Sequence, residues 1–324
     1  MKAVLHTTYG GPEVLRFTDV ETPSPADGDV LVRTHAVSLN ARDWHLLRGD
    51  PYLARLGAPE LGLRGPRVRI RGTDFAGTVD AVGPGVTDLA VGDEVFGEAP
   101  GAFAEYVVAP RDRVERKPAT LTMGEAAALP LAANTALIGL REVAGVGAGQ
   151  SVLINGASGG VGLFAVQLAA ADGAEVTAVC STRNVETVRS MGAHTVVDYT
   201  IEQPTGRYDV VFDLVGNRSL GELRRLLAPG GTLLLSGGGT SDGGSLFGPM
   251  GLVLRASALA PFVRERVVVL EAKPTAARLT VLRELADAGV LRPLVERTVP
   301  LAAAADAVRR METEHTRAKI VLAV

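Results

Sequence analysis

The stretch Ile154-Asn155-Gly156-Ala157-Ser158-Gly159-Gly160-Val161-Gly162 follows an apolar strand at 151–154 and opens a helical segment that runs to about Ala171. Glycines let the backbone turn sharply and let a pyrophosphate approach closely, and the helix N-terminus offers free N–H groups. The pattern departs from G-x-G-x-x-G, because Ala157 stands in the place of the first glycine. The strand–turn–helix context nevertheless predicts a dinucleotide-binding turn rather than a turn without a ligand. The predicted contacts are Ala157, Ser158, Gly159, Gly160, Val161 and Gly162.

The end of the next strand indicates which dinucleotide is bound. Folds that prefer NAD place Asp or Glu there to bind the ribose 2′-hydroxyl, whereas this chain reads Cys180-Ser181-Thr182-Arg183-Asn184. Ser181 can donate a hydrogen bond, and Arg183 carries a guanidinium suited to phosphate. The alternative for Arg183 is a solvated helix start. Tyr199 is a candidate to flank the adenine, or a half-buried strand end. We therefore predict NADPH as the cofactor.

Short apolar strands alternate with helical stretches from about Pro118 onward. This alternation predicts a parallel sheet buried on both faces. The expected strands are 151–154, 175–179, 195–197, 209–212, 232–235 and 266–270. Ligands bind at the carboxyl ends of such strands, which adds four candidate contacts: Leu214, Val215, Ser236 and Gly237.

The first third of the chain reads as short strands between Gly and Pro turns, such as 30–37, 78–82 and 104–108. This spacing predicts a compact β domain. The tail, with a strand at 294–299 and another at 319–322, is expected to pack back on that domain. The predicted domains are therefore 1–118 with 290–324, and an inserted cofactor domain at 119–289.

Composition excludes several classes of protein. The 324 residues are 47% hydrophobic and 21% charged, with a net charge of −3, so a sizeable core is expected and nucleic acid or anionic membrane is not. The arginines at 64, 67, 69 and 71 are expected to decorate one exposed strand face. A lone cysteine, Cys180, permits no internal disulfide. With neither a signal-peptide core nor a clean span of roughly 20 apolar residues, we expect a soluble, cytoplasmic protein.

Several motifs together resemble the medium-chain dehydrogenase/reductase superfamily, in its zinc-independent quinone oxidoreductase and enoyl reductase branch. Besides the glycine turn, they are Ser38-Leu39-Asn40-Ala41-Arg42-Asp43, Gly72-Thr73-Asp74-Phe75-Ala76-Gly77, Val91-Gly92-Asp93-Glu94-Val95-Phe96-Gly97, Ala128-Leu129-Pro130-Leu131-Ala132-Ala133-Asn134-Thr135-Ala136 and Arg317-Ala318-Lys319-Ile320-Val321-Leu322. The resemblance covers essentially the whole chain. It implies an α/β fold, with a Rossmann-type doubly wound parallel sheet inserted into a mainly β GroES-like catalytic domain.

The zinc-dependent members of the superfamily carry a Cys and a His-Glu pair at positions where this chain reads 39–43 and Thr73-Asp74. A catalytic zinc needs three protein ligands. The four-cysteine structural loop is also missing, since Gly97 runs almost directly to Glu105. We therefore expect no metal.

The likeness to the enoyl reductases also implies roles for single residues. Asn40 would touch the nicotinamide ribose or the substrate, and Tyr52 would be the proton or oxyanion donor, the alternative for Tyr52 being loop packing. Thr135 would contact the nicotinamide or phosphate, unless it caps a helix. Lys319 joins the cofactor contacts by the same likeness. Asp43 is expected to form a structural ion pair with Arg42.

These features predict an NADPH-dependent, zinc-free enzyme that transfers hydride to an activated C=C bond (enone, enal or enoyl) or to a quinone. The alternative is a cofactor-binding sensor or structural protein with little turnover. The partners expected are a small electrophilic substrate and a second copy of the chain, because an apolar last strand at 266–270 would leave a sheet edge unpaired. The apolar run 246–261 fits a substrate pocket or a subunit interface equally well.

Overall fold

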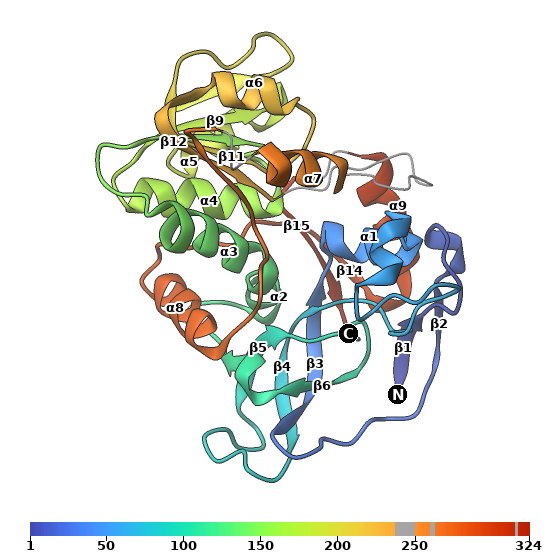
Figure 1. Ribbon diagram of the computed structural model, residues 1–324. Helices are drawn as coiled ribbons and strands as arrows, with labels where there is room; N and C mark the ends of the chain where they lie inside the picture. Colours follow the sequence, from blue (N-terminus) through green and yellow to red (C-terminus); the bar gives the residue numbers. More distant parts are fainter. Residues whose placement is uncertain (237–249, 260–262, 315–316) are drawn as a thin grey trace. The chain divides into compact units, whose positions relative to one another are not determined.

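The computed structural model describes residues 1–236, 250–259, 263–314 and 317–324. The chain divides into two compact units, which are described separately (Figure 1). Unit 1 comprises Met1–Asn134 and Lys273–Val324, and unit 2 comprises Thr135–Ala272. The insertion expected from the sequence is present, with narrower boundaries than 119–289. The reason is that helix α2 (Met123–Ala127) packs on strands of unit 1, and helix α8 (Ala276–Asp287) does so too.

Unit 1 is built on a mainly antiparallel sheet of seven strands. The order along the sheet is β14-β15-β3-β4-β5-β7, and β6 pairs with β3. The strands are β3 (Asp29–Ser38), β4 (Asp74–Val82), β5 (Glu94–Glu98), β6 (Tyr106–Pro110), β7 (Val114–Arg116), β14 (Val295–Pro300) and β15 (Lys319–Ala323). A separate hairpin joins β1 (Lys2–Leu5) to β2 (Arg16–Asp19). Helices α1 (Ala41–Arg48) and α9 (Ala304–Thr313) complete the unit.

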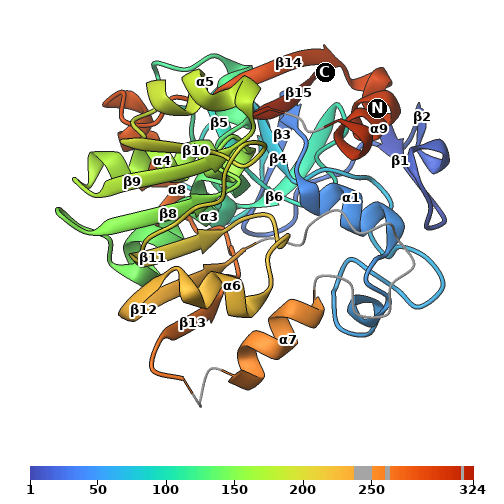
Figure 2. The same ribbon diagram turned by 90° about the horizontal axis from the view of Figure 1, so that it is seen from above.

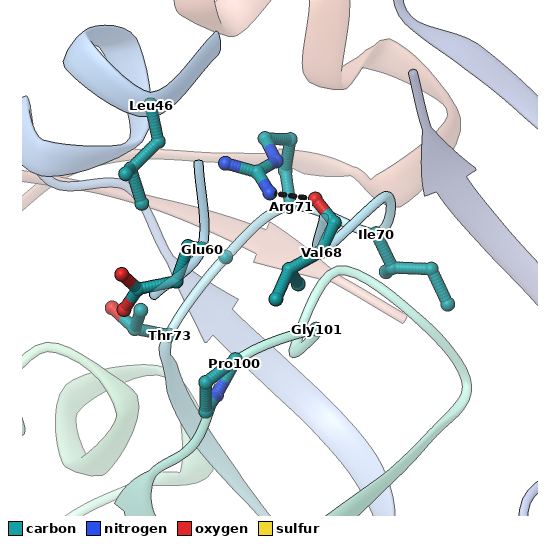
Figure 3. A pocket seen from close by; sticks show the side chains of 9 residues that line it. Leu46, Glu60, Val68, Ile70, Arg71, Thr73, Pro100 and Gly101 are labelled. Atoms are coloured by element: carbon teal, nitrogen blue, oxygen red, sulfur yellow. Dashed lines mark hydrogen bonds between the residues drawn. The ribbon is translucent and has the colours of Figure 1, made fainter. Parts of the chain in front are cut away.

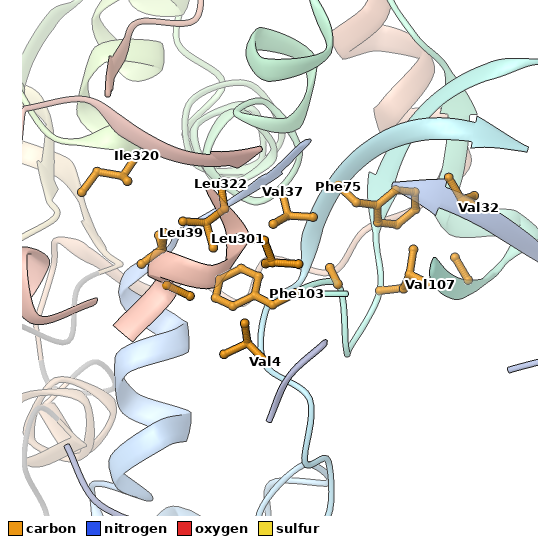
Figure 4. Packing of buried hydrophobic residues seen from close by; sticks show 14 of the residues in the cluster. Val4, Val32, Val37, Leu39, Phe75, Phe103, Val107, Leu301, Ile320 and Leu322 are labelled. Carbon is orange, nitrogen blue, oxygen red and sulfur yellow. The ribbon is translucent and has the colours of Figure 1, made fainter. Parts of the chain in front are cut away.

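The core of unit 1 gathers residues that are far apart in the sequence. Val4, Phe75 and Phe103 from the N-terminal part pack in one cluster with Leu301 and Leu322 from the tail (Figure 4). The tail is held by main-chain pairing as well, since β15 runs antiparallel to β3 and parallel to β14. The prediction that the tail packs on the first domain is therefore confirmed.

Unit 2 is a six-stranded parallel sheet in the order β10-β9-β8-β11-β12-β13. Numbered from β8, this is the 3-2-1-4-5-6 order of a Rossmann fold. The strands are β8 (Ser151–Asn155), β9 (Glu175–Cys180), β10 (Thr195–Asp198), β11 (Tyr208–Asp213), β12 (Leu227–Leu235) and β13 (Arg266–Val269). The helices are α4 (Gly160–Ala171), α5 (Val185–Ser190), α6 (Leu220–Arg225) and α7 (Met250–Leu259), while α3 (Pro130–Leu137) spans the boundary between the units.

Helices cover both faces of this parallel sheet (Figure 2). On one face Leu153, Val211 and Leu233 pack with Leu223 of α6 and Ala256 of α7. Because side chains alternate along a strand, the residues next to these three point to the other face. There the ring of Phe212 lies against Gly139, where an added Cβ would come within 3.0 Å of it. This two-sided burial explains why the strands are apolar throughout.

One expected strand is absent. The segment of the four arginines forms only isolated bridges at Leu61, Pro66 and Ile70. Arg64, Arg67 and Arg69 are exposed, but Arg71 is buried, with 3% of its surface exposed. The prediction of four arginines on one exposed strand face is therefore wrong, because this segment has no continuous strand ladder to impose alternation.

Candidate functional site

The glycine turn has the geometry that the sequence predicts. β8 ends at Asn155, Gly156 adopts a φ of +87°, and α4 begins at Gly160. The N–H groups of Gly156 and Ala157 donate to the carbonyl of Val179 at 3.2 and 3.0 Å, which ties the turn to β9. The positive φ is the left-handed region that favours glycine. Gly156 therefore makes the sharp turn, one residue before the position where G-x-G-x-x-G has its first glycine.

Gly162 lets the new helix pack directly on this turn. An added Cβ would lie 2.2 Å from the carbonyl oxygen of Gly156. Ala157 is fully buried and its N–H donates to the Val179 carbonyl of β9, so its side chain fills the interior of the turn. The first-turn N–H groups of Gly160, Val161 and Gly162 have no partner within an α-helix. They are the groups that can hold a pyrophosphate.

The end of β9 meets the glycine turn through a residue that sequence reasoning missed. Asn184 is buried, and its Nδ2 donates to Ser158 Oγ at 3.0 Å and to Ser181 Oγ at 3.1 Å. Two predicted contacts from separate motifs are thereby brought together. The adjacent Arg183 is exposed, and 41% of the surface of Tyr199 is exposed. A buried Asn between two serines leaves no periodic signal in a sequence.

One carboxylate near this turn is not singled out by any sequence motif. Asp198 closes β10, and it pairs in register with Cys180 at the end of β9. Its Oδ1 accepts from the N–H of Thr200 at 3.0 Å and from the Thr200 hydroxyl at 2.7 Å. The hydroxyl of Thr182 also bonds to this carboxylate and, with Thr200, lowers its pKa. The carboxylate is therefore held in place by these two threonines.

A buried pair links the ends of β8 and β11. Asn155 Nδ2 donates to Asp213 Oδ1 at 2.7 Å and to Asn217 Oδ1 at 2.9 Å. Asp213 Oδ1 also accepts from the N–H of Val215 at 3.3 Å. Leu214 donates its N–H to the carbonyl of Asn155 at 3.1 Å. The predicted contacts Leu214 and Val215 are thus ordered beside the glycine turn by residues that the sequence did not single out.

Two further candidates lie near the end of β12. Ser236 is half-buried, and its N–H donates to the Asp213 carbonyl at 3.0 Å. Gly237 lies outside the described residues, as do 246–249 and 260–261 of the apolar run. Within the described part of that run, α7 packs against β13.

Asn40 and Asp43 form the start of α1 in unit 1. Asn40 is the N-cap of the helix, and its N–H donates to Asp43 Oδ2 at 2.8 Å in a capping box. Burial raises the pKa of Asp43 to about 6. The predicted ion pair between Asp43 and Arg42 is wrong, because α1 turns the Asp43 carboxylate back onto its own N-terminus.

Lys319 binds Asn40 in the interior of unit 1. Its ammonium donates to Asn40 Oδ1 and to the carbonyl of Leu39, the latter at 2.9 Å. Asp74 lies 3.8 Å from the same ammonium and accepts from the N–H of Leu131 at 3.3 Å. Burial raises the pKa of Asp74 and lowers that of Lys319, and the opposite charge of each partner counteracts the effect. The predicted cofactor contact Lys319 is thus engaged with the β3–α1 junction.

Arg42 pairs instead with two buried glutamates. It donates to Glu60 Oε1, and its Nη1 lies 3.6 Å from Glu98 Oε1. Burial and the neighbouring Asp74 charge raise the pKa of Glu98 to about 8, against the pull of Arg42. The pKa values of Asp43, Asp74 and Glu98 are therefore all raised, so these buried carboxyl groups bind protons at a higher pH than usual.

Tyr52 lies just beyond α1, and 44% of its surface is exposed. The guanidinium of Arg55 lies 4.5 Å from the centre of its ring and 4.2 Å from that of Tyr9. Arg55 is anchored in turn to the carbonyl of Gly49 at 2.7 Å. The phenol is therefore accessible on a ring whose position is supported by a cation–π contact.

Thr135 does not cap a helix. Helix α3 begins at Pro130, so Thr135 sits in its interior, and it is buried. Its neighbour Asn134 donates from Nδ2 to the carbonyl of Lys273 at 3.2 Å. The capping alternative is excluded, and the predicted contact of Thr135 with the cofactor stays a prediction.

A small hollow in unit 1 contains the buried arginine (Figure 3). It is lined by Leu46, Glu60, Val68, Ile70, Arg71, Gly72, Thr73, Pro100 and Gly101. Arg71 donates from Nη2 to the carbonyl of Val68, while its Nε and Nη1 are buried and have no partner among the described residues. The hollow encloses about 210 Å³ even with open solvent included. Small-molecule pockets usually exceed roughly 300 Å³, so it is too small for a substrate of ordinary size.

Among the described residues, no three His, Cys, Asp or Glu side chains are grouped so that they could hold a metal. The helices of that part of the chain are all too short or too polar to cross a bilayer.

Comparison with known proteins agrees with this architecture. Residues 26–119 match the alcohol dehydrogenase GroES-like domain, and residues 191–322 match a family described as zinc-binding dehydrogenase. The Arabidopsis thaliana chloroplast envelope quinone oxidoreductase homolog is 31% identical over 99% of this chain and 98% of its own. The human mitochondrial NAD(P)H oxidoreductase RTN4IP1 is 33% identical over 100% of this chain and 89% of its own.

A solved structure extends the likeness to three dimensions. The quinone oxidoreductase from Coxiella burnetii is 30% identical, with a TM-score of 0.86, over 100% of this chain and 99% of that one. The chain therefore belongs to the medium-chain dehydrogenase/reductase family of oxidoreductases. Its relatives place it in the quinone oxidoreductase branch.

Proposed function

We propose that this protein is an NADPH-dependent, zinc-free reductase of activated C=C bonds or quinones. The observation that carries the proposal lies at the ends of β8 and β9 in unit 2, where we place the adenosine of the cofactor. Ser158 of the glycine turn and Ser181 at the end of β9 both accept a hydrogen bond from the Asn184 side chain, next to the exposed Arg183. Residues 181–184, between β9 and α5, include no carboxylate, and Asp198 of β10 is bonded to Thr200 and Thr182. Hydroxyl donors and a guanidinium suit a 2′-phosphate.

Nicotinamide dinucleotides fit the glycine turn. The backbone of Gly156 and the close packing at Gly162 leave the helix N-terminus accessible to a pyrophosphate. In support, the human relative is named as an NAD(P)H oxidoreductase. The preference for NADPH over NADH is our assignment from Ser158, Ser181 and Arg183.

A catalytic zinc does not fit the residues at Thr73 and Asp74. The Thr73 hydroxyl donates to Asp74 at 3.3 Å, and the Asp74 carboxylate is committed to Lys319 and to the N–H of Leu131. The one cysteine, Cys180, is buried at the end of β9 in unit 2. Zinc sites use three protein ligands, which supports chemistry without zinc although one matched family is described as zinc-binding.

When bound, the nicotinamide supplies a hydride to the electrophilic carbon of the substrate. The residues of unit 1 then have two tasks, to stabilise charge on the substrate oxygen and to protonate the α-carbon. We assign the proton to the accessible phenol of Tyr52. Asn40 is assigned to the cofactor ribose or the substrate from its place at the N-cap of α1, where Lys319 fixes its Oδ1.

The test follows NADPH absorbance with a panel of enones, enals and quinones, with and without a chelator. We expect turnover with at least one class, no loss on chelation, and a lower kcat/KM with NADH. Tight NADPH binding without turnover would favour the sensor alternative. Stoichiometric zinc whose removal abolishes activity would contradict the zinc-free assignment.

A further inference from the structure

Asn184 is buried where two parts of the cofactor domain meet. Only 3% of its surface is exposed. Its Nδ2 has two protons and uses them on Ser158, in the turn before α4, and on Ser181, in the turn after β9. Asn184 precedes α5 but makes no side-chain hydrogen bond that caps this helix. Its side chain is therefore directed at the two serines rather than at local helix structure.

The direction of these hydrogen bonds has a chemical consequence. A hydroxyl group carries one proton and two acceptor lone pairs. Because Asn184 is the donor in both hydrogen bonds, neither serine uses its own hydroxyl proton in them. Among the described residues neither hydroxyl donates a hydrogen bond, so both protons are available to an acceptor. Two hydroxyl donors held by one side chain suit an anion with several oxygens, such as a phosphate.

A second observation points to a ligand at the same place. The Oδ1 atom of Asn184 is buried and has no hydrogen-bond partner among the described residues. A buried acceptor without a donor is costly, and such atoms call for an explanation. A ribose hydroxyl is a donor of the kind it lacks, and it reaches this covered atom only if the cofactor displaces the groups that now pack over it. A phosphorylated ribose thus offers oxygens for the serines and a hydroxyl for the amide oxygen.

We propose that Asn184 determines cofactor specificity by holding Ser158 and Ser181 as paired hydroxyl donors to the 2′-phosphate of NADPH. The proposal rests on the proposed function, in that the cofactor binds at the glycine turn. Asn184 would act indirectly, by orienting the two serines, and this role is separate from the direct charge contact assigned to Arg183.

The test measures binding of adenosine 2′,5′-bisphosphate and of 5′-AMP by calorimetry, which requires no substrate and no turnover. Asn184→Ala should weaken the bisphosphate about tenfold or more, the scale of one lost hydrogen bond to a charged group. The affinity for 5′-AMP should stay the same. Asn184→Asp keeps the shape and removes the donors, so it should weaken the bisphosphate at least as much. Ser190→Ala, at an exposed position of α5, is the control and should change neither affinity.

A double-mutant cycle separates this role from a merely structural one. In a Ser158→Ala/Ser181→Ala background, adding Asn184→Ala should change the affinity for the bisphosphate little further. A full additional loss there would overturn the proposal, as would equal losses for the bisphosphate and 5′-AMP. If the wild type prefers the bisphosphate and Asn184→Ala and Asn184→Asp keep that preference, the proposal alone fails. A wild type without that preference overturns the NADPH assignment itself, and the proposal with it.

Discussion

The ammonium of Lys319, in the last strand of the chain, lies 3.8 Å from the carboxylate of Asp74, at the start of β4, and both side chains are buried. Asp74 also accepts from the N–H of Leu131 near the start of α3, and Lys319 holds Asn40 at the start of α1. This pair therefore connects the tail to the N-termini of α1 and α3, two helices that are associated with candidate site residues.

Removing one member of this pair should destabilise the protein. Lys319→Met leaves a buried carboxylate without its cation, which typically costs about 3–5 kcal/mol. We expect a clear fall in the urea midpoint, and partial recovery in the double variant Lys319→Met/Asp74→Asn. Lys2→Met, which breaks the exposed pair with Asp19, should leave the midpoint unchanged. An unchanged midpoint in Lys319→Met would show that the pair contributes nothing to stability.

Stability should fall with rising pH because of Glu98. Its pKa is about 8 in the fold against an ordinary 4.5, so the folded state binds more protons between these values. The free energy of unfolding therefore decreases as pH rises through that window. Glu98→Gln mimics the protonated form and should flatten the decline in Tm, measured by differential scanning fluorimetry between the two pH limits. The exposed Glu175→Gln should keep the wild-type slope; an equally steep decline in Glu98→Gln would count against this assignment.

Arg183→Ala should narrow the preference for NADPH. Losing one hydrogen bond to a charged phosphate, worth roughly 1.5–3 kcal/mol, should raise the NADPH KM about 10- to 100-fold. The NADH KM should barely move, since NADH has no 2′-phosphate. Steady-state kinetics with both cofactors checks this, with Arg189→Ala as the control because that arginine pairs with Glu186 on the surface of α5. Equal losses with both cofactors would mean that Arg183 supports the fold.

Tyr52→Phe should slow the reduction of an enone more than it weakens substrate binding. General acid catalysis contributes about 10²–10⁴-fold, so kcat should fall within that range while KM changes little. With a quinone the effect should be smaller, because solvent readily protonates the phenolate product. The quinone reaction is thus an internal control for folding. An enone kcat equal to that of the wild type would remove Tyr52 from the mechanism.

The edge strand β13 predicts a homodimer. It ends the parallel sheet of unit 2, and an unprotected edge offers N–H and C=O groups to a second copy. We expect a dimer by light scattering at micromolar concentration and a shift toward monomer in Val269→Lys. Val281→Lys is the matched control, since 36% of Val281 on α8 is exposed against 37% of Val269. A monomeric wild type would contradict the prediction.

Much of the cofactor domain could be predicted because its signals are local. Apolar runs bounded by turns predict the strands β8, β9 and β11. Gly156 is required by its positive φ and Gly162 by the close approach of α4 to the turn, and both requirements arise within a few neighbouring residues. Ser158 and Ser181 could be chosen for the same reason, each from its own motif. Their shared contact with Asn184 could not, because it depends on how the β8–α4 turn meets the end of β9.

The amino-acid sequence by itself determined the order of the elements, the glycine turn, the lack of a carboxylate after β9 and the absence of a Cys and a His-Glu pair from the positions of a zinc site. Only the tertiary structure decided the burial of Arg71, the partner of Arg42 and the contact of Lys319 with Asn40 and Asp74. The physical reason is range. Periodicity and turn chemistry act over a few neighbouring residues, whereas a charge in the core finds its partner through strand register and packing between segments far apart in the chain.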